Sequence, residues 1–239
     1  MAFVDVMRKR DYNPVVSYEQ VRPLMQWTYV WMVLGLVVTT VVAYLTVNTD
    51  MLLQLRASTG IVFGAIIVEF ILVIALSWAM PRLSAGVAAI MFIVYAALNG
   101  FTLSVLLLVY AEAAVTTAFL ATAGLFGALS VFAFTTQIDL TRWQNYLFVG
   151  LVGLLIAMVV NMFVGSGALE WLISIIGVLI FTALIAFDTQ KLKRLAASPE
   201  FQENGSAVAK MSIFMALELY LDFVNLFIFL LRLFGSSRD

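Results

Sequence analysis

The sequence predicts an all-α membrane protein with seven transmembrane helices. Hydrophobic residues make up 64% of the 239 positions, charged residues only 11%, and the mean hydropathy is +1.06. Soluble domains carry about 25% charged residues, so this composition excludes that class. The absence of Cys and His excludes thiol catalysis and Cys or His metal sites, and the chain has no basic tract suited to nucleic acid. Sequence alone gives no oligomeric state.

Seven apolar segments account for most of the chain, and each reaches the length of about 20 residues that a bilayer-spanning helix needs. We expect a tail at 1–22 with no cleavable signal pattern, a single seven-helix domain at 23–235 and a short tail at 236–239. Glu69 interrupts the second segment, whereas the third, fourth and fifth contain no charged residue. The predicted helices are 24–47, 60–80, 86–110, 113–136, 143–165, 168–190 and 208–234.

Lys and Arg are distributed unevenly between the two sides that these segments define. One side holds ten of them: Arg8, Lys9, Arg10, Arg22, Arg82, Arg142, Lys191, Lys193, Arg194 and Lys210. The other side holds three: Arg56, Arg232 and Arg238. The positive-inside rule therefore predicts a cytoplasmic N-terminus, with the C-terminus outside if all seven segments cross and inside if the last is re-entrant.

Small residues recur at helical spacing in the fourth and fifth segments. Gly124 with Gly127, and Gly150 with Gly153, have the spacing typical of close helix packing. We assign these glycines a packing role only.

The seventh segment carries polar residues at a spacing that places them on one face of a helix. This stripe consists of Glu218, Asp222, Asn225, Phe229 and Arg232. A carboxylate at bilayer depth costs about 2.5 to 3.5 kcal/mol on insertion scales, so such groups face the bundle interior and mark ion, proton or substrate paths. Asp222 lies near the middle of the segment. A neutral, hydrogen-bonded structural aspartate is the alternative interpretation.

Asp188, at the end of the sixth segment, is the natural companion of Asp222. It shares a face with Gly177, which would let a partner helix approach closely. A hydrated aspartate at the helix end beside Lys191 is the alternative. If the two carboxyl groups meet in a low dielectric they cannot both ionise easily, so the pair would share one proton and respond to pH. Carboxylates also suit Ca²⁺, so both residues are candidate metal ligands.

Glu69 lies about halfway along the second segment. It either pairs structurally with Arg232 or serves as a further functional acid. Glu218, Asn225, Glu69 and Arg232 are therefore the supporting polar residues of the predicted site.

Four stretches resemble the Bax inhibitor-1 family, also called the transmembrane Bax-inhibitor-motif family, and in particular its bacterial inner-membrane members. They are SAGVAAIMFIVYAALNGFTLS, GLFGALSVFAFTT, AFDTQKLK and LYLDFVNLFIFLLRLFG. The resemblance implies that the last helix is central and surrounded by the other six. It also implies a pH-sensitive calcium leak governed by a carboxylate pair, which maps onto Asp188 and Asp222.

The family also has an arginine near the cytoplasmic end of the second helix that holds the first of these acids when the path is shut. Here the equivalent position is Met80. Arg82 takes that role, Arg142 replaces it, or closure depends on the carboxylates alone.

Four functions remain in view. We favour a pH-sensitive calcium (cation) leak channel gated by the aspartate pair, with the lipid bilayer, calcium ions and protons as its partners and no cofactor. A proton-coupled transporter would use the same acids as carriers, and a regulatory membrane protein would transport nothing. An intramembrane aspartyl protease is disfavoured because Leu219, Tyr220 and Leu221 precede Asp222 where such enzymes have a Gly-x-Gly motif. We predict that the protein is not an enzyme.

Overall fold

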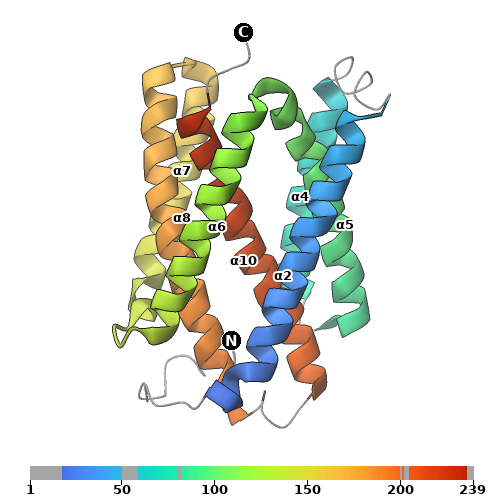
Figure 1. The fold of residues 1–239 in the computed structure, drawn as a ribbon, viewed down its shortest axis with the longest axis vertical. Helices are drawn as coiled ribbons and strands as arrows, with labels where there is room; N and C mark the ends of the chain where they lie inside the picture. The colour runs from blue at the N-terminus through green and yellow to red at the C-terminus, as the bar shows by residue number, and fades with distance from the viewer. Residues whose placement is uncertain (1–17, 50–58, 80–81, 200, 202–204, 236–239) are drawn as a thin grey trace.

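The computed structural model describes residues 18–49, 59–79, 82–199, 201 and 205–235. Within these ranges the chain forms seven long helices and one short 3₁₀ helix (Figure 1). In chain order they are α2 (Tyr18–Val47), α4 (Thr59–Ala79), α5 (Ala85–Val109), α6 (Glu112–Thr135), η2 (Leu140–Trp143), α7 (Gln144–Val164), α8 (Gly167–Ala196) and α10 (Gly205–Phe234). The expectation of an all-helical protein with seven long helices is confirmed.

Two helix ends differ from the sequence prediction by more than a few residues. Helix α2 begins at Tyr18, inside the predicted tail, and α8 continues to Ala196 rather than ending at 190. The extension of α8 carries Lys193, which donates to the Phe134 carbonyl at the end of α6, and Arg194, which binds Asp139 between α6 and α7. A prediction from hydropathy places the end of a helix where charged residues begin. Here the charged residues have partners, so the helix continues beyond the apolar stretch.

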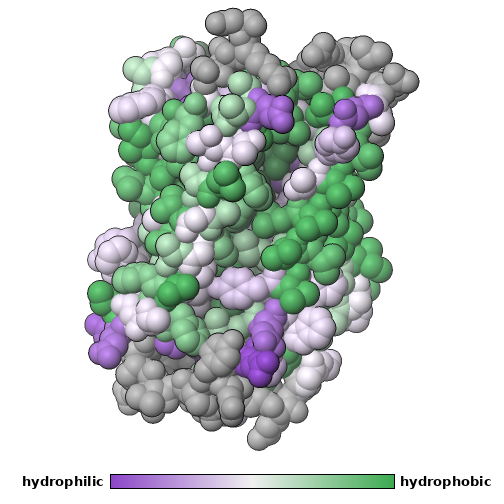
Figure 2. Space-filling view, viewed as in Figure 1, coloured by the Kyte–Doolittle hydropathy of each residue, from purple (hydrophilic) through white to green (hydrophobic). Residues whose placement is uncertain are grey.

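Six helices in the described part of the chain are long and apolar enough to cross a membrane, and α4 adds a shorter apolar stretch at Gly64–Ala79. Figure 2 shows hydrophobic residues over the middle of the visible face and hydrophilic residues near its two ends. This is the distribution that a bilayer-embedded bundle requires.

Helix α10 lies between two groups of three helices. Helices α2, α4 and α5 pack together on one side, and α6, α7 and α8 pack together on the other. Helix α10 packs against α2, α5, α6 and α8. In its apolar window 67% of the residues are buried, against 11–33% in the five other candidate spans, so α10 is the most buried candidate span in the described part of the chain.

Close helix approaches occur at Gly100 and Gly177. They do not occur at Gly124, Gly127 and Gly153, where the spacing indicated them. A Cβ added at Gly153 would meet no atom within 4 Å, and the same holds for Gly124 and Gly127. At Gly177 it would meet the Phe229 ring at 2.7 Å, and at Gly100 it would meet the backbone of Thr39. The prediction for Gly177 is confirmed, and Gly150 makes an ordinary contact with Ile180 of α8, 3.5 Å from an added Cβ. The prediction is wrong for Gly124, Gly127 and Gly153, because nothing packs against those positions.

Candidate functional site

Asp188 of α8 and Asp222 of α10 meet inside the bundle. Their residues are 8% and 5% exposed, and a side-chain hydrogen bond joins them. Asp188 lies two turns before the end of α8, so the interpretation of a hydrated helix-end aspartate does not fit. The sequence-based expectation that these two groups come together agrees with this geometry.

A hydrogen bond between two carboxyl groups requires a proton on one of them. Lys191 Nζ lies 3.9 Å from Asp188 Oδ1, so Asp188 has the neighbour that favours its charged form. Asp222 Oδ2 is buried with no hydrogen-bond partner, which is costly for a carboxylate and tolerable for a neutral acid. Asp188 thus has the nearby positive charge, and Asp222 has the buried oxygen without a hydrogen-bond partner.

A third acid and a base complete the cluster. Lys191 Nζ donates to both carboxylate oxygens of Glu218, each at 2.7 Å. Lys191 follows Asp188 by three residues and Glu218 precedes Asp222 by four, so each helix presents two groups on one face. The result is a four-residue group, which we call the acid cluster: Asp188, Lys191, Glu218 and Asp222.

Glu69 belongs to a different polar group on the far side of α10. It accepts hydrogen bonds from Thr102 Oγ1 at 2.8 Å and from Asn99 Nδ2 at 3.4 Å. Asn99 Oδ1 in turn accepts from the Tyr220 hydroxyl at 3.0 Å, and Thr39 Oγ1 lies 2.6 Å from the same hydroxyl. We call this chain of hydrogen bonds across α2, α4, α5 and α10 the tyrosine network.

The predicted pairing of Glu69 with Arg232 is wrong for the described structure, in which Arg232 lies over the Phe229 ring, 5.7 Å from its centre. Glu69 is level with the tyrosine network, and Arg232 is twelve residues beyond Tyr220, about 18 Å further along the helix axis. Asn225 also stays outside the acid cluster, because its side chain donates to the carbonyl of Leu221.

Neither predicted basic partner reaches Asp188 in the described part of the chain. Arg142 Nε binds Asp139 Oδ2 at 3.2 Å with its side chain 83% exposed, and Arg82 is exposed. Met80 lies outside the described residues. The base beside Asp188 is Lys191, which belongs to the same helix.

The last two turns of α8 hold the end of α6 and the segment between α6 and α7. Gln190 accepts from the Leu140 amide at 2.7 Å and donates to the Ile138 carbonyl at 2.8 Å, while Lys193 donates to the Phe134 carbonyl at 2.7 Å. Arg194 binds Asp139 and Thr141. We call these contacts the loop clamp.

Asp139 lies outside the membrane-spanning helices, at the N-cap of η2. Partial burial raises the pKa of its carboxyl. The hydrogen bonds from Thr141 and the charge of Arg194 outweigh that effect, so the pKa of Asp139 lies below its ordinary value.

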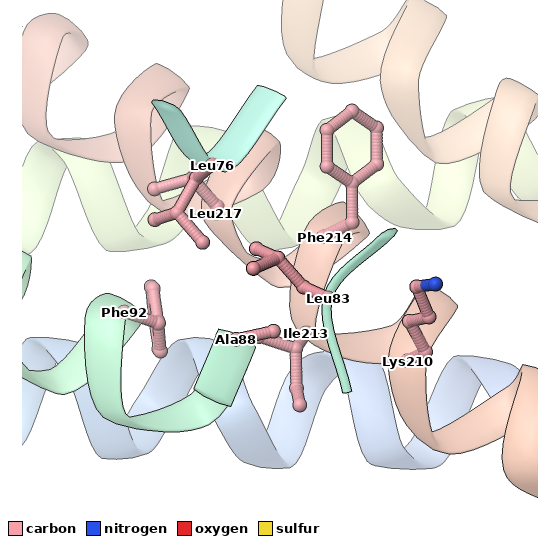
Figure 3. A pocket seen from close by; sticks show the side chains of 8 residues that line it. All are labelled: Leu76, Leu83, Ala88, Phe92, Lys210, Ile213, Phe214 and Leu217. Carbon is pink, nitrogen blue, oxygen red and sulfur yellow. The ribbon is translucent and has the colours of Figure 1, made fainter. Parts of the chain in front are cut away.

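A small apolar pocket lies near the start of α10, apart from both polar groups. Figure 3 shows the eight side chains around it, with the amine of Lys210 at its edge. The lining consists of Leu76, Leu83, Ala88, Phe92, Lys210, Ile213, Phe214 and Leu217. Because no acid lines it, this pocket offers no cation site.

The described residues contain no group of three or more His, Cys, Asp or Glu side chains arranged to hold a metal ion. Metal ligation by Asp188 and Asp222 stays a prediction.

Sequence reasoning missed Lys191 and Tyr220 as members of these groups. For Lys191 the signal was present, since it follows Asp188 by three residues. Tyr220 stands two residues before Asp222, about 200° around the helix, so it faces the opposite side of α10. From the sequence, the partner of Tyr220 could have been recognised only as a polar residue within another apolar segment, such as Asn99.

Comparison with known proteins gives one family. The family model described as inhibitor of apoptosis-promoting Bax1 matches residues 21–239. The inner membrane protein YbhL of Escherichia coli K12 is 42% identical over 215 residues, which cover 90% of this chain and 92% of YbhL. An uncharacterised protein of Deinococcus radiodurans is 46% identical over 223 residues, covering 93% and 94% of the two chains. The match spans both α8 and α10, which carry the acid cluster, and the chain belongs to the Bax inhibitor-1 family.

Proposed function

We propose that the protein is a pH-sensitive calcium leak channel whose path is controlled by Asp188 and Asp222. The observation that carries the proposal is the hydrogen-bonded pair of acids, buried between α8 and α10. A polar pair at this depth is costly in a membrane protein and is typically retained for function. Family membership supports the same assignment.

The described conformation corresponds to a shut path. Around α10 the space before the pair is filled by Leu219 and the space after it by Leu226 and Leu231, all fully buried, and by Phe229, 3% exposed, which packs on Gly177. A hydrated cation needs α8 and α10 to move apart. The shared proton joins these two helices, so its gain or loss changes the energy of that movement.

The orientation and the full enclosure of α10 are part of the proposal. The end of the bundle where α8 ends and α10 begins carries most of the basic residues and would face the cytoplasm, with the N-terminus. Helix α4 would complete seven crossings, and α10 would be surrounded by the other six helices. The membrane would be a bacterial inner membrane, the location that the name of YbhL states for that protein.

The test is calcium flux into vesicles that contain the purified protein and a trapped calcium indicator, measured as a function of pH. We expect a sigmoidal pH dependence that Asp222→Asn removes, because an amide cannot exchange the shared proton. Glu170→Gln, an exposed acid on α8, is the matched control and keeps the wild-type profile. Flux that ignores both pH and Asp222→Asn refutes the proposal.

A proton-coupled transporter using the same acids predicts a different result in this assay. Protons would move in fixed proportion to calcium, and an imposed proton gradient would drive calcium against its own gradient. A leak moves calcium only down the calcium gradient. A regulatory protein would give no flux above protein-free vesicles.

A further inference from the structure

Helices α8 and α10 run antiparallel and pack against each other through one face of each (Figure 1). The acid cluster occupies this contact near the end of α8. Phe181 precedes Asp188 by seven residues, and Phe229 follows Asp222 by seven. Both rings therefore lie on the same helix faces as the two acids, about 10 Å nearer the start of α8.

The two rings close the contact between α8 and α10 by tight packing. Phe181 and Phe229 are both buried, and their rings are stacked with centres 5.8 Å apart and planes at 27°. The Phe229 ring also covers Gly177 of α8, where an added Cβ would lie 2.7 Å from three of its carbons. At this level the contact consists of two rings and the bare backbone of one glycine.

Burial alternates along this face of α10. Asp222 and Phe229 are buried, whereas Asn225 between them and Arg232 beyond them are partly exposed. Phe229 is thus a closed, apolar point with a more accessible polar residue on either side. Channels use short apolar constrictions of this kind to exclude water and so to stop ions. Packing of a helix core does not by itself require a buried ring between two polar residues.

We propose that the stacked rings of Phe181 and Phe229, seated on Gly177, are an apolar seal that closes the cation path between the acid cluster and the end of the bundle where α8 begins. This inference rests on the proposed function, because the seal acts on the path that Asp188 and Asp222 control. It adds a second closed point to that path. A cation that passes the acids must still displace the Phe229 ring.

The chain contains no cysteine, so a single introduced cysteine can be labelled selectively. Asn225→Cys places a thiol between the acids and the ring seal, and Ser166→Cys places one at the N-cap of α8, outside the seal. A small membrane-impermeant methanethiosulfonate is applied to intact cells that express the protein and to inside-out membrane vesicles. The preparation in which Ser166→Cys reacts exposes the end where α8 begins, and the labelling rate of Asn225→Cys is measured there.

We expect Asn225→Cys to react about tenfold faster when it is combined with Phe229→Ser, because the constriction then admits water and the reagent. Serine is used rather than alanine because a purely apolar cavity stays dry, whereas a hydroxyl gives water a hydrogen-bond partner. Phe229→Leu keeps apolar bulk at the same position, so its labelling rate should stay close to that of Asn225→Cys alone.

Phe126→Ser is the matched control for a cavity elsewhere in the bundle. Phe126 is a buried ring of α6 that packs edge-on against Phe223, on a different face of α10, so its loss should leave the labelling rate of Asn225→Cys unchanged. If Phe229→Ser does not reach the membrane, Phe181→Ser removes the opposing ring and carries the same expectation. The seal is overturned if removal of either ring leaves the labelling rate unchanged, or if Phe126→Ser raises that rate as much.

Labelling does not depend on transport, so its outcome is distinguishable from that of the proposed function. If calcium flux follows pH and Asp222→Asn abolishes that dependence, but Phe229→Ser does not expose Asn225→Cys, the channel stands and the seal fails. If Phe229→Ser exposes Asn225→Cys while the wild type gives no pH-dependent flux, the rings seal this contact against water but no calcium channel runs through it.

Discussion

Replacing Tyr220 with phenylalanine removes one hydroxyl from the face of α10 opposite the acid cluster. Tyr220 is fully buried, and its ring packs edge-on against Phe92 and Tyr95, with ring centres 5.7 and 5.9 Å away. The substitution keeps these ring contacts. It removes the hydrogen bond to Asn99 Oδ1 at 3.0 Å and the contact with Thr39 Oγ1 at 2.6 Å.

The loss of stability in Tyr220→Phe comes mainly from the buried acceptor, Asn99 Oδ1, that loses its donor. Thr39 Oγ1 keeps the carbonyls of Ala96 and Gly35 within 2.9 Å, so it retains a partner. Asn99 Oδ1 loses the Tyr220 donor while Asn99 is only 7% exposed. Hydrogen bonds inside membrane bundles average about 0.6 kcal/mol, and a buried orphaned acceptor costs about 1 to 3 kcal/mol. We therefore expect Tyr220→Phe to lower the free energy of unfolding by about 2 kcal/mol.

Reversible unfolding of the purified protein in mixed micelles measures this change. Tyr146→Phe is the matched control, because Tyr146 is 80% exposed and its loss of a hydroxyl should stay within about 0.5 kcal/mol. Thr39→Val, alone and combined with Tyr220→Phe, completes a double-mutant cycle. Because the two hydroxyls contact each other, the combined loss should be smaller than the sum of the single losses.

A Tyr220→Phe variant as stable as the Tyr146→Phe control would refute this reasoning. So would strict additivity in the cycle, since it would mean that the two hydroxyls do not interact. In either case the tyrosine network would not hold α10 against α2 and α5.

Three further substitutions test the packing and the loop clamp. Gly100→Ala should destabilise the protein by about 1 to 3 kcal/mol, because its new methyl group meets the backbone of Thr39, which a side-chain rotation cannot relieve. Gly153→Ala, where nothing lies within 4 Å, should instead stabilise by about 0.5 to 1 kcal/mol, and the same unfolding assay separates the two. Asp139→Asn should destabilise at neutral pH by an amount that shrinks in acid. Since the folded-state pKa of Asp139 lies below its ordinary value, its stabilising effect is present above that ordinary value and is lost as pH falls through the lowered one. Unfolding of wild type and Asp139→Asn from neutral pH to below pH 4 checks this, and a difference that stays constant would contradict it.

The helices and the aspartate pair could be predicted because both follow from the cost of polar groups in lipid. A run of about 20 apolar residues has few alternatives to a spanning helix. Acids within such runs must face the interior, and Asp188 and Asp222 were the natural pair on adjacent segments. Sequence alone also placed Gly177 at a close contact, which the Phe229 ring now occupies.

What failed was the matching of partners along the membrane normal. Charge complementarity suggested that Glu69 binds Arg232, but it contains no information on how far each residue lies along its helix. The true partners of Glu69, Thr102 and Asn99, are neutral, so no charge signal identified them. Spacing of glycines likewise failed at Gly153, because the same pattern occurs on faces that touch no other helix.

Helix α8 carries residues of both the acid cluster and the loop clamp, and the two sets lie on different faces of the helix. Asp188 and Lys191 face α10, while Gln190, Lys193 and Arg194 hold the end of α6 and the segment between α6 and α7. The two sets alternate within two helical turns, so the backbone of α8 cannot move at one set without moving at the other. A separation of Asp188 from Asp222 by movement of α8 must therefore either carry the segment between α6 and α7 along or break the loop clamp. Weakening the clamp should thus change how readily the pair separates, even though none of its residues contacts Asp222.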